Sequence, residues 1–62
     1  MTILQAINEA GRMKAEGDKE GAGALLQKVN DALASGYWAG TAGYDHLWTC
    51  KTILLEVLGN ES

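Results

Sequence analysis

Apolar residues recur along this chain at the three- and four-residue spacing that places them on one face of an α-helix. In the first segment these residues are Ile3, Ala6, Ile7, Ala10 and Met13. The second segment repeats the pattern with Ala22, Leu25, Leu26, Val29, Ala32 and Leu33. Polar residues occupy most of the opposite side of each helix, as is typical of amphipathic helices. The pattern therefore predicts two helices, over residues 3–16 and 19–35.

Signals at the ends of these segments support the same boundaries. Thr2 and Gln5 have the spacing of a capping box, in which each side chain bonds the backbone amide of the other residue. Gly17 favours a left-handed C-terminal stop, and Asp18 is a preferred N-cap for the helix that follows. Gly11 lies inside the first helix, where glycine costs about 1 kcal/mol relative to alanine. A glycine at this position can indicate a close helix crossing.

Two glycines, Gly21 and Gly23, lie near the start of the second helix. Free backbone amides at a helix N-terminus form a common anion site. The further glycine and the Lys–Ser/Thr pair of a phosphate-binding loop are missing, so the motif is only partial. A frayed first turn or close packing is the alternative interpretation, because glycine lowers helix propensity.

The third predicted helix, residues 44–58, is far more apolar than the other two. Its apolar residues are Tyr44, Leu47, Trp48, Cys50, Ile53, Leu54, Leu55, Val57 and Leu58. On a helical wheel they cover an arc of about 220°, whereas one core-facing stripe needs little more than about 100°. A helix of this kind is expected at the centre of a core or against a second subunit.

The short length of the chain favours the second of these two interpretations. Its 62 residues make a single domain, and its one cysteine cannot form an internal disulfide. Domains this small usually need a staple or a partner subunit. We therefore expect an all-α, three-helix bundle that assembles as a homo-oligomer, most simply a two-fold dimer. The predicted interface residues are Leu47, Leu54, Leu55 and Leu58. The alternative is a monomer in which the third helix lies between the other two.

The charge pattern disfavours several classes of partner. The net charge is −3, and Lys51 is the only basic residue from Val29 onward. Nucleic-acid binding needs clustered Lys and Arg, and so does binding to an anionic membrane surface. No apolar run reaches the length of a membrane span, and the N-terminal residues lack a signal-peptide pattern. We expect a cytoplasmic protein with Cys50 kept as a thiol.

All four aromatic residues lie between Gly36 and Cys50, and they are Tyr37, Trp38, Tyr44 and Trp48. Tyr and Trp are typical hot spots of protein interfaces. Three glycines within residues 36–43 predict a loop that carries Tyr37 and Trp38. We expect the four aromatic residues to form a partner-binding surface, with the two loop residues as the best candidates for function. Tyr44 and Trp48 also suit a core or a subunit interface.

Lys51 interrupts the apolar side of the third helix. A lysine at such a position commonly packs its stem and extends its ammonium to water. Tyr44 and Trp48, one turn or two earlier, can add cation–π contact. The alternative is a ligand site in which Lys51, Tyr44 and Trp48 bind a nucleotide-like anion between subunits.

His46 and Cys50 are the remaining residues with reactive side chains. They are four residues apart, so they can share one helix face as half of a zinc site, but structural zinc normally takes four ligands. A Cys–His pair on one rigid helix also lacks a cleft and oxyanion donors. We therefore expect no metal, no cofactor and no catalytic residue. A surface histidine and a small buried cysteine are the simpler interpretation.

Together these features predict a small, non-enzymatic protein that self-associates and binds a protein partner as a regulator or inhibitor. Stand-alone acidic proteins of this size often have such roles, including in phage and other mobile elements. The alternatives are an oligomeric binder of a nucleotide-like ligand and a subunit of a larger complex.

Overall fold

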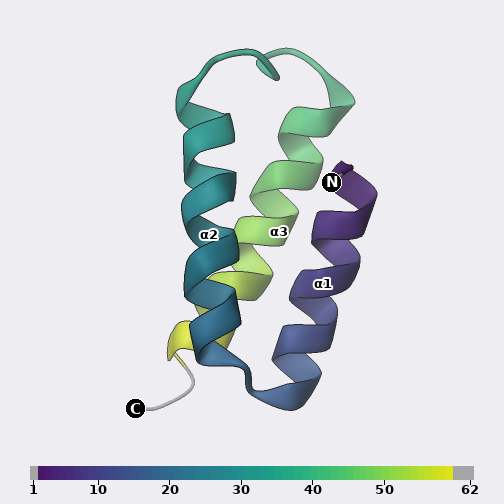
Figure 1. Ribbon diagram of the computed structural model, residues 1–62. Coiled ribbons are helices and arrows are strands. Elements are labelled where there is room, and N and C mark those ends of the chain that lie inside the picture. The colour runs from purple at the N-terminus through teal and green to yellow at the C-terminus, as the bar shows by residue number, and fades with distance from the viewer. Residues whose placement is uncertain (1, 60–62) are drawn as a thin grey trace.

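Three α-helices packed against one another make up the fold (Figure 1). The computed structural model describes residues 2–59, and it contains α1 (Ile3–Glu16), α2 (Lys19–Ala34) and α3 (Ala42–Gly59). No strand occurs in this range. α2 runs antiparallel to α1 and α3, and the bundle measures 33 × 18 × 15 Å. The predicted all-α, three-helix fold is confirmed. Within the same range, no helix combines the length and apolarity needed to cross a membrane.

The predicted boundary signals are present at both ends of α1 and at the start of α2. Thr2 Oγ1 accepts a hydrogen bond from the Gln5 amide at 3.2 Å, and Gln5 Oε1 accepts one from the Thr2 amide at 2.9 Å. Gly17 adopts a left-handed conformation with φ of 70°, and Asp18 Oδ1 accepts from the Gly21 amide at 3.0 Å. Local capping therefore sets both ends of the short α1–α2 connection.

The structure tests the expectations for Gly11 and Gly21. A Cβ on Gly11 would meet nothing within 4 Å, so the expected close helix crossing at this position is wrong. A Cβ on Gly21 would lie 2.5 Å from Oδ2 of Asp18. The carboxylate of the N-cap thus packs against Gly21 and accepts from its amide, whereas a Cβ on Gly23 would meet nothing within 4 Å.

The connection between α2 and α3 differs slightly from the expected one. α2 ends at Ala34, one residue earlier than predicted, and Ser35 is its C-cap. α3 begins at Ala42, two residues earlier than predicted, and continues through Gly59. The Thr41 carbonyl accepts from the Tyr44 amide at 3.1 Å, which extends the helical turn back toward the loop. Ala42 and Gly43 gave no hydrophobic signal, so periodicity did not include them.

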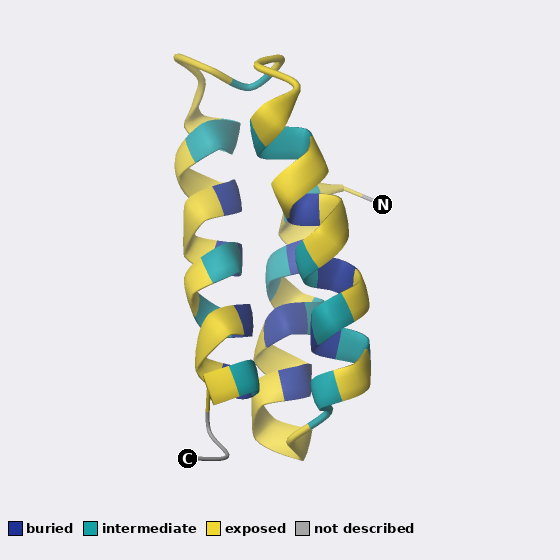
Figure 2. Cartoon of the chain, turned by 90° about the vertical axis from the view of Figure 1, so that its left-hand side faces the viewer, coloured by how far each residue is buried: buried dark blue, intermediate teal, exposed yellow. Residues whose placement is uncertain are grey.

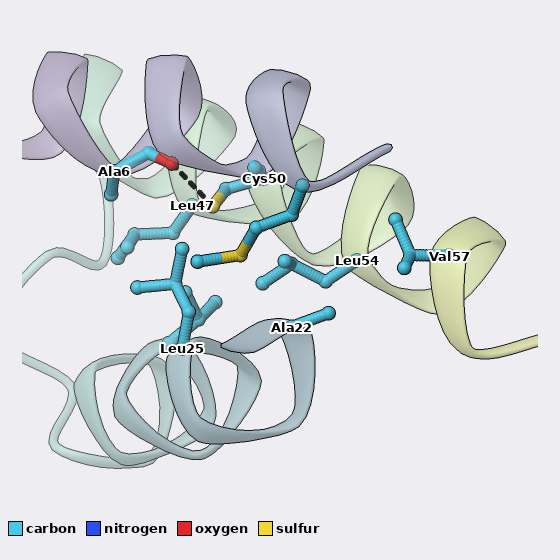
Figure 3. Close-up of a cluster of buried hydrophobic side chains, with 10 residues drawn as sticks. Ala6, Ala22, Leu25, Leu47, Cys50, Leu54 and Val57 are labelled. Carbon is cyan, nitrogen blue, oxygen red and sulfur yellow. Dashed lines mark hydrogen bonds between the residues drawn. The ribbon is translucent and has the colours of Figure 1, made fainter. Parts of the chain in front are cut away.

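The core lies along α3, which contacts both α1 and α2 far more extensively than these two contact each other. Its buried side chains converge from all three helices (Figure 3). They are Ala6, Ala10, Met13, Ala22, Leu25, Val29, Leu47, Cys50, Leu54 and Val57. Small alanines on α1 and α2 face larger residues of α3, which allows the helices to approach closely. α3 is thus the central helix of the core, and it still leaves one of its sides in solvent (Figure 2).

Candidate functional site

A row of large side chains runs along the solvent-facing side of α3, and we call this row the outer face of α3. It consists of Tyr44, Trp48, Lys51 and Leu55, which are spaced four, three and four residues apart. This spacing keeps them on one side of the helix. Trp48 is 44% exposed and Leu55 is 49% exposed, while Tyr44 and Lys51 are half-buried. The outer face is therefore a largely apolar surface with one positive charge, and it is not covered by α1 or α2.

Trp48 is the centre of this row because it contacts both of its polar-tipped neighbours. The Tyr44 and Trp48 rings lie edge to face, with 6.3 Å between centroids and an interplanar angle of 65°. Lys51 Nζ lies 4.9 Å from the centroid of the Trp48 ring, within the range of a cation–π contact. The expected contact of Lys51 with Trp48 is thus present. These contacts hold the three side chains in a defined arrangement on the helix surface.

The four leucines predicted for the oligomer interface do not lie together. Leu47 and Leu54 are 4% and 0% exposed, and they belong to the core of the single chain. Leu58 is half-buried and packs against the same core, whereas Leu55 is on the outer face. The wide apolar arc of α3 combines a line that faces α1 and α2 with a line that faces solvent. Leu47 and Leu54 therefore present no surface to a second subunit in this fold.

The two aromatic residues of the α2–α3 loop have different environments. Tyr37 is 78% exposed. Trp38 is half-buried and packs against the core, so of the two loop residues only Tyr37 is exposed to solvent. Their rings meet edge to face with 5.1 Å between centroids. The Trp38 carbonyl accepts from the Thr41 hydroxyl at 2.6 Å, which helps to fix the loop around the indole.

Sequence reasoning missed a close contact that positions Trp38. A Cβ on Gly43, in the first turn of α3, would lie 2.5 Å from Cε3 of Trp38 and 2.8 Å from Cδ1 of Ile3. The loop, the start of α1 and the start of α3 therefore meet at one residue without a side chain. The only signal in the sequence was a glycine next to an aromatic-rich loop. The neighbouring small residues Gly40, Thr41 and Ala42 gave no indication of which position makes the close contact.

His46 and Cys50 share a helix but not an environment. Cys50 is fully buried, and its thiol donates to the Ala6 carbonyl at 3.5 Å (Figure 3). Burial raises the pKa of this thiol, because desolvation disfavours the thiolate. His46 is exposed. Among residues 2–59, no group of three or more His, Cys, Asp and Glu side chains is arranged to hold a metal ion. Cys50 thus lies in the core as a small apolar residue.

The ion pairs found within residues 2–59 lie on the surfaces of α1 and α3. Arg12 bonds Glu9 and Glu16 on α1, and the hydrogen bond and charge of Glu9, with the charge of Glu16, raise the pKa of its guanidinium. Lys14 of α1 pairs with Glu56 of α3 across the surface of the bundle. Lys51 differs from these cations because its ammonium contacts an aromatic ring, that of Trp48. This places a positive charge in the middle of an apolar row.

Comparison of the chain with protein-family models, curated proteins and solved structures finds no significant match. Inference about function therefore rests on the geometry of the chain's own residues. The outer face of α3 and the exposed ring of Tyr37 are the two candidate binding features in this geometry.

Proposed function

We propose that this chain is a small, non-enzymatic interaction protein of the cytoplasm. It self-associates through the outer face of α3, and it binds a protein partner as a regulator or inhibitor. The observation that carries the proposal is the row of Tyr44, Trp48, Lys51 and Leu55, which leaves large apolar side chains in solvent along about three turns of one helix. Isolated exposed apolar residues are common, but a contiguous row of them is typical of an interaction surface.

The composition of the outer face suits a helix–helix interface. Residues spaced four, three and four apart form the seam along which two helices pack. Trp and Tyr supply most of the binding energy at many interfaces, because each buries a large area with few rotatable bonds. The contacts of Trp48 with Tyr44 and Lys51 already restrict these side chains in the single chain. Less conformational entropy is therefore lost on association.

A two-fold, antiparallel pair of α3 helices provides favourable contacts for the Lys51 ammonium, the single charge of this surface. If the helices cross between Trp48 and Lys51, each Trp48 faces the Lys51 of the second copy. Each Tyr44 then faces Leu55 of the second copy. This register separates the two ammonium groups and gives each an aromatic ring from both copies. The same patch serves both subunits, as a closed two-fold interface requires.

Light scattering on a sizing column tests self-association. We expect the purified chain to be a dimer and Leu55→Glu to be a monomer, because the substitution places a charge in the seam. Leu4→Glu is the matched control, since Leu4 is 65% exposed and belongs to α1 and not to the outer face of α3. A wild-type monomer at all concentrations, or equal loss of the dimer in both variants, would contradict the proposed interface.

Tyr37 is the proposed contact with a protein partner. Its ring is the most exposed of the large apolar side chains in the described range, and the Ser35 hydroxyl accepts from its backbone amide at 3.2 Å. We expect Tyr37→Ala to weaken binding of a copurifying partner without changing the helix content of the chain. Leu4→Ala serves as the control for loss of an exposed apolar residue. Equal partner binding by both variants and the wild type would exclude Tyr37 from that interface.

A second candidate function is binding of a nucleotide-like anion at the outer face. The supporting observation is the position of Lys51 Nζ beside the Trp48 ring, where a planar base can stack and a negative charge can pair. Lys51→Met separates the two functions. It should abolish binding in an anion site, whereas removal of the charge from a protein interface is neutral or stabilising. Titration of the wild type and this variant with a panel of nucleotides measures the difference.

A further inference from the structure

A pocket of about 210 Å³ lies between the start of α1 and the C-terminal half of α2, away from the outer face of α3. Figure 1 shows these two segments at the same level of the bundle. Its apolar walls are formed mainly by Ile3, Ala6, Leu25, Val29, Ala32 and Trp38. Thr2 and Lys28 are its two polar lining residues. None of the residues of the outer face lines it.

The packing of the bundle explains why this pocket is present. α1 and α2 each pack on α3 but contact each other sparsely. Two of the residues that line the space between them are alanines, Ala6 and Ala32, and these do not fill it. Trp38 also lines the pocket, and its indole and the Ile3 side chain pack against Gly43. The pocket thus has mainly apolar walls, and two of its lining residues, Ile3 and Trp38, are held in place by the start of α3.

The charges around the pocket favour an anion at its rim. Lys28 is the only charged residue that lines it, and Lys28 is in none of the ion pairs found within residues 2–59. Thr2 and Ile3 contribute the N-terminal end of α1, which carries a partial positive charge. The first turn of α1 contains no acidic side chain to neutralise that charge. A lysine and a helix N-terminus therefore act on the same opening.

We propose that this pocket binds a small amphipathic anion, namely a medium-chain aliphatic carboxylate. The aliphatic chain of the ligand lies among the apolar walls beside Trp38, and the carboxylate pairs with the Lys28 ammonium near the start of α1. The volume supports a small ligand, because pockets for drug-sized molecules usually exceed about 300 Å³, whereas an apolar cavity of about 150 Å³ is enough for benzene. The site is independent of the self-association proposed for the outer face.

Fluorescence of Trp38 reports binding directly. In the Trp48→Phe variant Trp38 is the only tryptophan. Titration with octanoate should give a saturable shift of its emission to shorter wavelength, because the aliphatic chain of octanoate displaces water from the indole. Ala32→Leu should abolish the shift by filling the pocket. Ala34→Leu is the matched control, because Ala34 is exposed and lies two residues further along the same helix. Circular dichroism checks that both variants keep their helix content.

Lys28→Gln tests the charge without altering the core. We expect it to weaken octanoate binding by about two- to fivefold, the range of exposed ion pairs, and to leave binding of uncharged octan-1-ol unchanged. This comparison remains decisive if Ala32→Leu does not fold. The proposal is overturned if octanoate gives no saturable change, if Ala32→Leu binds as well as Ala34→Leu, or if Lys28→Gln affects the acid and the alcohol equally.

Discussion

Gly43 of α3 is in direct contact with the indole ring of Trp38, and a Cβ at this position would lie 2.5 Å from Cε3 of the ring. Real Cβ atoms do not approach other atoms so closely, and the indole is a rigid group. The absence of a side chain at residue 43 is therefore what allows the α2–α3 loop to fold back onto the bundle. Ile3 depends on the same space, since its Cδ1 would be 2.8 Å from that Cβ.

Replacement of this glycine should destabilise the fold. We expect Gly43→Ala to lower the free energy of unfolding by about 1–3 kcal/mol, the usual cost of overpacking. Gly11→Ala is the matched control, because Gly11 is also helical and its Cβ would meet nothing within 4 Å. The control should raise stability by up to about 1 kcal/mol. Urea denaturation measures both, and equal effects of the two changes would show that the contact with Trp38 is unimportant.

Leu54 and Leu4 should respond very differently to truncation. Leu54 is fully buried at the centre of the core, whereas Leu4 is 65% exposed on α1. Leu54→Ala should cost about 2–5 kcal/mol through lost burial and a residual cavity, enough to unfold much of a domain this small. Leu4→Ala should stay within about 0.5 kcal/mol of the wild type. Circular dichroism in urea would contradict the core assignment if Leu54→Ala proved as mild as Leu4→Ala.

The capping box at the start of α1 gives a third prediction. Thr2→Ala removes the oxygen that accepts from the Gln5 amide, and it should lower the free energy of unfolding by about 1 kcal/mol. Thr49→Ala is the control, because Thr49 is an exposed residue of α3 whose hydroxyl donates to the Asp45 carbonyl. The control should change stability by less than about 0.5 kcal/mol. The cap is unimportant if thermal melts of the two variants coincide.

Burial of Cys50 predicts a loss of stability at alkaline pH. The folded state raises the pKa of the thiol above its ordinary value of about 8.5. Below that ordinary value both states keep the proton, so the thiol adds no pH dependence. Above it the unfolded state loses its proton first, and the free energy of unfolding falls as pH rises.

Comparison of the wild type with Cys50→Ala isolates this contribution. The alanine variant cannot ionise at this position, so the stability advantage of the wild type should shrink between about pH 8 and pH 10. Urea denaturation at several pH values measures the difference. A constant or growing difference over this interval would mean that the thiol ionises as easily in the folded state as in the unfolded one.

The helices themselves follow from local features of the sequence. The apolar spacing of α1 and α2, the Thr2–Gln5 capping box, the left-handed Gly17 and the Asp18 N-cap all act within a few residues. Their consequences were therefore predictable without any knowledge of distant contacts. The predicted bounds of α1 agree with the structure at both ends, and those of α2 differ by one residue.

Only the tertiary structure decided the roles of the residues in and around α3. Its apolar arc is wide enough for two faces, and the positions of α1 and α2 determine that Leu54 is buried while Leu55 is exposed. The same packing turns Trp38 inward onto Gly43 and leaves Tyr37 in solvent. Periodicity records which residues of one helix share a side. It contains no information about where the other helices lie, because that arrangement depends on contacts between residues far apart in the chain.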